Sequence, residues 1–195
     1  MVTNVLLTGV GGQGIITAST VLSQACRLAG WEVKKSEVHG MSQRGGSVNS
    51  YVRFSPDGQV ASPLIPEGAA GIMLAFEPLE GLRQIGQTAP DATVLIEERR
   101  IVPVTVNLEG FSYPEDVLER VLGSGREVTV IAAAQAATEL GEPRAANTIM
   151  LGALSTLVEL PGDAWERALR LVLKPEAVDV NLEAFRAGQE LMKSD

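Results

Sequence analysis

The 195-residue chain is long enough for one good hydrophobic core or two small ones, and its apolar (45%) and charged (21%) shares are ordinary for a globular protein. Its formal net charge of −8 argues against nucleic-acid binding and against docking on anionic lipid, because both need a basic face. The single cysteine, Cys26, and single histidine, His39, exclude an intrachain disulfide and a protein-held iron–sulfur cluster, and leave too few ligands for a usual zinc site. We expect no metal site in this chain. With no signal-peptide pattern and no apolar run of roughly 18 residues, we expect a cytoplasmic protein that does not enter a membrane.

The first part of the chain predicts a strand–helix–strand unit. A short apolar run at Asn4–Thr8 ends at glycines and predicts a buried strand. Apolar residues recur at helical spacing over Ile15–Ala29, and Gly30 occupies the position of a C-cap glycine. Trp31–Val38 predicts a second strand, parallel to the first and reached by a right-handed crossover.

The remaining chain alternates predicted strands and helices after a polar, glycine-rich loop at His39–Gly46. We expect strands at Ser47–Phe54, Gly71–Ala75, Thr93–Glu97, Pro103–Val106 and Glu127–Ala132, with Gln59–Ser62 as a candidate hairpin partner. Helices are expected at Leu79–Ile85, Pro114–Leu122, an alanine-rich segment after Ala132, Asn147–Leu160, Ala164–Leu173 and Leu182–Met192. The order predicts an α/β fold over residues 1–195: one domain, a three-layer Rossmann-like open sheet flanked by helices, with a helical C-terminal end.

The segment Gly9–Gly14 (GVGGQG) fits the pattern G-x-G-x-x-G, and it lies between a predicted strand and a predicted helix. Glycines permit close approach of a ligand, and a helix N-terminus offers free N–H groups to an anion. One interpretation is a dinucleotide site in a free-standing Rossmann-like protein, with Glu37 on the ribose. The other is that the glycines only permit a tight turn and dense packing. The segment is not a Walker A loop, because no Gly-Lys-Ser/Thr follows it.

A second unusual segment follows the second predicted strand, at the edge where open α/β sheets place their ligand crevice. It reads His39, Gly40, Met41, Ser42, Gln43, Arg44, Gly45, Gly46. Arg44 could bind a carboxylate or phosphate in bidentate fashion, and His39 could act as an acid or base near neutral pH. The alternative is an interface loop. A lone histidine without a nearby nucleophile is weak evidence for catalysis, so we assign no catalytic residue.

Together with later segments, these two motifs resemble those of a known protein family. GVGGQGI, EVHGMSQRGGSV, SPLIPEGAA and FEPLEGLR resemble the gamma-type component of the 2-oxoacid:ferredoxin oxidoreductase family, with the greatest likeness in its indolepyruvate branch. NTIMLGAL (147–154) and NLEAFRAG (181–188) extend the resemblance over almost the whole chain. It implies a subunit of a thiamine-diphosphate-dependent enzyme that oxidatively decarboxylates an arylpyruvate to an acyl-CoA. Coenzyme A accepts the acyl group, and iron–sulfur clusters pass electrons to ferredoxin.

The resemblance also implies a division of labour. In the family, thiamine diphosphate with its magnesium ion and the iron–sulfur clusters belong to a larger alpha subunit, so this chain is expected to hold no cofactor firmly and to be inactive alone. The matched positions are expected to shape a surface facing that subunit or the coenzyme A path: Gly9, Gly11, Gly12, Gln13, Gly14, and His39 through Gly46. The all-round apolar helix at Asn147–Leu160 is expected to be buried in the core or against a partner, and to drive self-association of the isolated chain.

Overall fold

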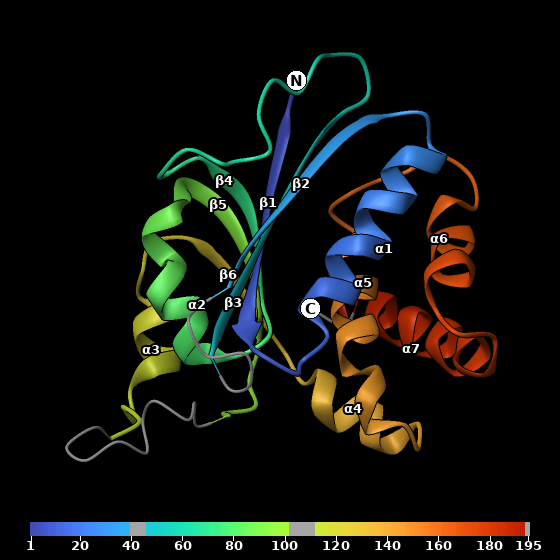
Figure 1. The fold of residues 1–195 in the computed structure, drawn as a ribbon. Coiled ribbons are helices and arrows are strands. Elements are labelled where there is room, and N and C mark those ends of the chain that lie inside the picture. The colour runs from blue at the N-terminus through green and yellow to red at the C-terminus, as the bar shows by residue number, and fades with distance from the viewer. Residues whose placement is uncertain (40–45, 102–111, 194–195) are drawn as a thin grey trace.

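The computed structural model describes residues 1–39, 46–101 and 112–193, with His39 described by its backbone alone. A six-stranded sheet of order β2-β3-β1-β4-β5-β6 forms the centre (Figure 1). β1, β4, β5 and β6 are parallel, and β3 runs antiparallel to both β1 and β2. The strands are β1 (Thr3–Val10), β2 (Glu32–His39), β3 (Ser47–Ser55), β4 (Ala70–Ala75), β5 (Thr88–Glu97) and β6 (Glu127–Ile131).

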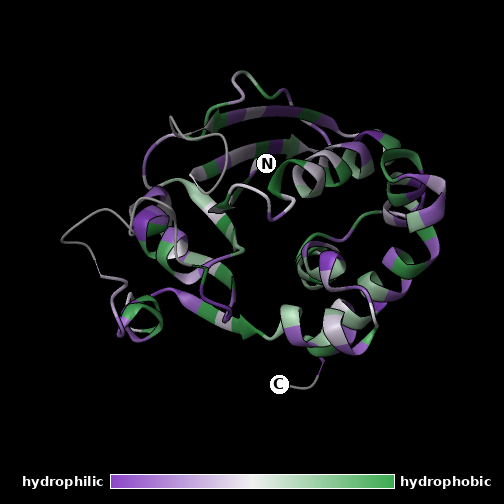
Figure 2. Cartoon of the chain, turned by 60° about the horizontal axis from the view of Figure 1, so that its bottom comes forward, coloured by the Kyte–Doolittle hydropathy of each residue, from purple (hydrophilic) through white to green (hydrophobic). Residues whose placement is uncertain are grey.

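Helices cover both faces of the sheet, which confirms the predicted three layers. One face carries α2 (Pro78–Gln84) and α3 (Val117–Leu122), and the other carries a larger helical layer (Figure 1). Figure 2 shows both hydrophobic and hydrophilic residues on the helices around the sheet. The larger layer contains α1 (Ile15–Leu28), α4 (Ala133–Glu139), α5 (Ala146–Ser155), α6 (Ala164–Val172) and α7 (Val178–Leu191). In the described ranges, no helix combines the length and apolar character that a membrane span requires.

The C-terminus of α1 shows how local sequence sets a boundary. Gly30 has φ +79°, and its N–H donates to Arg27 O (3.0 Å) while the N–H of Trp31 donates to Cys26 O (3.0 Å). This is the Schellman arrangement, which needs a left-handed residue and therefore favours glycine. The end of the first helix is thus confirmed within one residue.

One predicted element is absent, and the bounds of others differ from those expected. Gln59–Ser62 forms no strand. Arg53 Nη1 donates to Ser62 O and Leu64 O (both 2.9 Å), so these carbonyl groups bond to a side chain and not to a neighbouring strand. The helix expected over Asn147–Leu160 ends at Ser155, where Ser155 Oγ and Thr156 Oγ1 donate to the carbonyl groups of the last turn. The helix expected from Pro114 begins at Val117. The strand expected at Pro103–Val106 lies outside the described residues.

The apolar helix α5 is buried by its own chain. It crosses α7 at a glycine on each helix: a Cβ at Gly152 would overlap Phe185 O, and one at Gly188 would overlap Ile149 O. Every residue from Thr148 to Ser155 is buried. The prediction that this helix is buried is confirmed. Residues 148–155 therefore offer no apolar face for self-association, and the oligomeric state of the isolated chain stays a prediction.

Candidate functional site

The glycine-rich loop joins β1 to α1 at the carboxyl edge of the parallel strands. Gly12 has φ +104° and Gly14 has φ +79°, conformations that residues with a side chain rarely adopt. Gly14 is the N-cap of α1, and no side chain caps that helix end. The first turn of α1 therefore presents N–H groups and the positive end of the helix dipole at this edge.

Gln13 holds the loop in place. Its Oε1 accepts the N–H of Val10 (2.7 Å), and its Nε2 donates to the carbonyl of Phe76, which directly follows β4. A Cβ at Gly9 would lie 2.7 Å from Gln13 Oε1, so glycine at position 9 makes room for this side chain. Gln13 thereby ties the loop to the ends of two neighbouring strands.

The loop also contacts two distant segments. Asn147 Nδ2, in the first turn of α5, donates to Gly14 O (3.4 Å), and a Cβ at Gly14 would overlap that amide. The N–H of Gly11 donates to Gly46 O (2.8 Å). The structure thus brings the end of the second motif against the first. Ser42, Gln43, Arg44 and Gly45 of the second motif lie outside the described residues.

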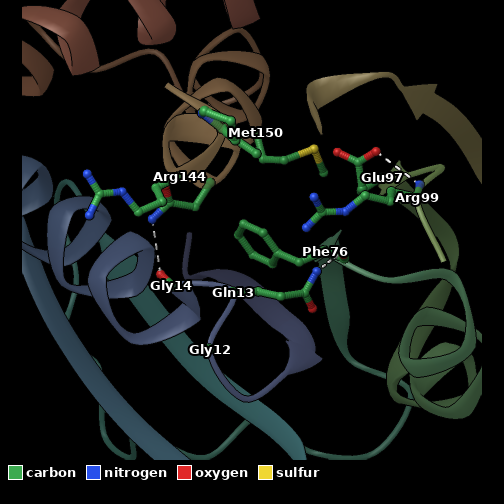
Figure 3. A pocket seen from close by; sticks show the side chains of 11 residues that line it. Gly12, Gln13, Gly14, Phe76, Glu97, Arg99, Arg144 and Met150 are labelled. Atoms are coloured by element: carbon green, nitrogen blue, oxygen red, sulfur yellow. Dashed lines mark hydrogen bonds between the residues drawn. The ribbon is translucent and has the colours of Figure 1, made fainter. Parts of the chain in front are cut away.

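A pocket of about 370 Å³ lies beside the loop (Figure 3). The side chain of Arg99 points into it, towards Phe76 (Figure 3). Arg144, on the α5 side, is exposed and pairs with Glu142 (2.9 Å). The lining residues come from the loop (Gly12, Gln13, Gly14), from the chain after β4 and around the end of β5 (Phe76, Glu97, Arg99), from the turn before α5 (Pro143, Arg144) and from α5 itself (Ala146, Asn147, Met150).

Glu97, the last residue of β5, is the buried acid of the pocket wall. The residue is only 4% exposed. Its carboxylate accepts the N–H groups of Arg99 (3.0 Å) and Ala134 (2.8 Å). Burial raises the pKa of this carboxyl above its usual range, although the two N–H bonds oppose the shift.

The pocket residues outside the loop were not predicted from the sequence. Glu97 ends a predicted strand and Arg99 follows it, so the rule that ligands bind at the carboxyl ends of parallel strands was a usable signal for both. Arg144 and Met150 had no comparable signal, because their place depends on how α5 packs.

The strand order does not favour the dinucleotide interpretation. β1 and β2 run in the same direction, as predicted, but β3 lies between them. Two strand spacings amount to about 10 Å, so β2 is not the neighbour of the glycine loop that ribose recognition requires. Glu37 on β2 instead pairs with Lys35 (2.7 Å).

The fold and site define an α/β protein in which a glycine-rich loop faces a cationic pocket, on a strand order unlike that of dinucleotide-binding domains. The chain belongs to the pyruvate ferredoxin/flavodoxin oxidoreductase family, whose profile matches residues 4–191. It is 40% identical to the indolepyruvate oxidoreductase subunit IorB of Pyrococcus horikoshii, over 97% of this chain and 96% of that protein. Other relatives are subunits of oxidoreductases named for ketoisovalerate and 2-oxoglutarate. The resemblance found in the sequence is confirmed.

Solved structures share the fold. The keto/oxoacid ferredoxin oxidoreductase gamma subunit of Geobacter sulfurreducens superposes with a TM-score of 0.74 at 21% identity, covering 99% of both chains. A 2-oxoglutarate:ferredoxin oxidoreductase from Magnetococcus marinus, solved with 2-oxoglutarate, coenzyme A and succinyl-CoA bound, has a TM-score of 0.78 at 23% identity. This chain is covered completely there but spans 31% of the longer chain.

Proposed function

We propose that the chain is the smaller subunit of a thiamine-diphosphate-dependent oxidoreductase that decarboxylates an arylpyruvate, such as indolepyruvate, to an acyl-CoA and reduces ferredoxin. The similarity to an indolepyruvate oxidoreductase subunit over nearly the whole length of both proteins supports the substrate class. The larger alpha subunit is the partner in this proposal. It supplies the thiamine diphosphate, its magnesium ion, the iron–sulfur clusters and the contact with ferredoxin.

The residues of this chain do not fit the redox cofactors. The sequence holds one cysteine, whereas a protein-held cluster takes about four. Cys26 is fully buried, and burial raises the pKa of its thiol to about 12, so it is a poor source of the thiolate that metals bind. Across the parts of the chain that the structure describes, no three histidine, cysteine or acidic residues gather as metal ligands do.

The pocket fits the acyl acceptor better. Coenzyme A carries phosphate groups, and phosphate is favoured by an uncapped helix N-terminus, by backbone N–H groups of a glycine loop and by a guanidinium. The pocket beside Gly12–Gly14 combines these three features, with Arg99 pointing into it (Figure 3). This arrangement is the observation that carries the proposal. The chain thus contributes part of the coenzyme A path, and the larger subunit completes it.

The test uses the complex purified with its larger subunit. Arg99→Met keeps an unbranched apolar stem and removes the guanidinium with its charge. We expect the KM for coenzyme A to rise about tenfold, since a hydrogen bond to a charged group is worth about 1.5 kcal/mol or more. The KM for the arylpyruvate should stay the same. Arg120→Met, an equivalent loss of charge at an exposed position of α3 on the opposite face, is the matched control. An unchanged KM for coenzyme A in Arg99→Met contradicts the proposed role of the pocket.

A further inference from the structure

The turn after β5 is pinned by two buried carboxylates. Glu97 accepts the N–H groups of Arg99 (3.0 Å) and of Ala134 in the first turn of α4 (2.8 Å). Glu77, fully buried at the start of α2, accepts the N–H of Ile101 (3.4 Å) and the hydroxyl of Tyr113 (2.6 Å). Residues 97–101 are therefore fixed near both ends, and Arg99 lies between the two fixed points.

Arg99 depends on this backbone for its position. The residue is exposed, and among the described residues its guanidinium makes no hydrogen bond or close ion pair, although its charge acts on the nearby Glu97 carboxyl. Nevertheless it lines the pocket, with its side chain pointing in towards Phe76 (Figure 3). A long side chain without an anchor of its own is placed mainly by the turn that carries it, so whatever holds that turn sets where the charge can act.

A carboxylate at position 97 has a cost that a neutral residue would avoid. Burial raises the pKa of both Glu97 and Glu77, which means that the charged form is disfavoured at these sites. A carboxylate has two acceptor oxygens and can take the N–H groups of two chain segments at once, whereas a glutamine amide has one acceptor oxygen and two donor hydrogens. The two hydrogen bonds that Glu97 accepts join the Arg99 turn to α4, and a carboxylate is needed to accept both.

We propose that Glu97 is a positioning residue for the acyl acceptor, because its carboxylate ties the Arg99 turn to α4 and so aims the Arg99 guanidinium at a phosphate group in the pocket. The inference rests on the proposed function, in which the pocket receives coenzyme A. Glu97 lies in the pocket wall, but its two oxygens already accept the N–H groups of Arg99 and Ala134, so we expect it to act through Arg99. Its removal should therefore affect acceptor binding and leave the decarboxylation steps on the larger subunit unchanged.

A double-mutant cycle in the purified complex tests this. Glu97→Gln should raise the KM for coenzyme A about tenfold, equivalent to about 1.4 kcal/mol, with kcat and the KM for the arylpyruvate within about twofold of wild type. If Glu97 acts through Arg99, adding Glu97→Gln to Arg99→Met should produce no further rise. Glu98→Gln, which removes the neighbouring exposed charge without breaking these bonds, should behave as wild type.

The outcomes separate the two proposals. If Arg99→Met raises the KM for coenzyme A and Glu97→Gln does not, or if their effects add, the positioning role is overturned and the proposed function stands. If Arg99→Met has no effect, the pocket is not an acceptor site, and both proposals are overturned. Should Glu97→Gln fail to assemble, Glu97→Asp replaces it. It keeps the charge on a side chain one methylene shorter, which should not reach both N–H groups, so a wild-type KM in Glu97→Asp also contradicts the role.

Discussion

Gly14 and Gly30 offer a matched pair of substitutions at the two ends of α1. Both have φ +79°, a conformation that costs a residue with a Cβ about 1–2 kcal/mol. They differ in their surroundings: a Cβ at Gly30 would meet nothing within 4 Å, whereas a Cβ at Gly14 would lie 3.0 Å from Asn147 Cγ and closer still to its amide nitrogen. Gly14→Ala must therefore displace Asn147 and lose its bond to Gly14 O, which adds about 1 kcal/mol.

Urea denaturation of the purified chain and coenzyme A kinetics of the complex measure the two effects. We expect Gly30→Ala to lower the free energy of unfolding by about 1–2 kcal/mol and Gly14→Ala by about 2–3 kcal/mol. Only Gly14→Ala should raise the KM for coenzyme A, because only Gly14 lines the pocket. Equal losses of stability together with unchanged kinetics would refute the reasoning that the loop and α5 form one site.

Three further predictions concern the side chains of Gln13, Glu77 and Cys26. Gln13→Ala leaves the N–H of Val10 and the carbonyl of Phe76 without their partner. The free energy of unfolding should fall by about 1–3 kcal/mol in urea denaturation, and the KM for coenzyme A should rise. Unchanged values would show that the two Gln13 hydrogen bonds are dispensable. Burial raises the pKa of Glu77, so the folded state holds this proton more tightly than the unfolded chain, and the stability contributed by this group falls as the pH rises through the folded pKa. Glu77→Gln lacks this loss, so its unfolding free energy relative to wild type should rise as the pH increases from the usual glutamate pKa through the folded pKa. A difference independent of pH would contradict the shift. Because burial raises the pKa of Cys26 to about 12, iodoacetamide should label it only after unfolding, as mass spectrometry can follow, and rapid labelling of the native chain would argue against its burial.

Much of the fold follows from local sequence signals. Apolar runs at residues 4–8 and 71–75 give central parallel strands because both faces of such strands are buried. The period of residues 15–29 with Gly30 after it gives α1 almost to the residue. The order of the strands in the sheet does not follow from such local signals. The alternating segment at 47–54 predicts a strand, but nothing within it says that it inserts between β1 and β2, because that choice depends on long-range pairing.

The site was only half predictable for the same reason. Gly12 and Gly14 have the positive φ that their pattern suggests, and Gln13 clamps the loop as a polar residue between glycines can. The basic lining residues are Arg99 after β5 and Arg144 in the turn before α5, and these segments reach the loop only when the sheet and α5 are assembled. The buried acids Glu77 and Glu97 look like surface residues in the sequence, and only the N–H groups around them explain why they are inside.

The central claim is that this chain lacks a redox centre and supplies part of the coenzyme A site to a larger subunit. Ferredoxin reduction driven by an arylpyruvate and coenzyme A tests it most directly, measured for the chain alone, for the wild-type complex and for the complex with Arg99→Met. We expect no activity for the chain alone and full activity for the complex. The variant should need about tenfold more coenzyme A, with its arylpyruvate dependence unchanged. Turnover by the chain alone, or a variant complex that cannot be told from wild type, would contradict it.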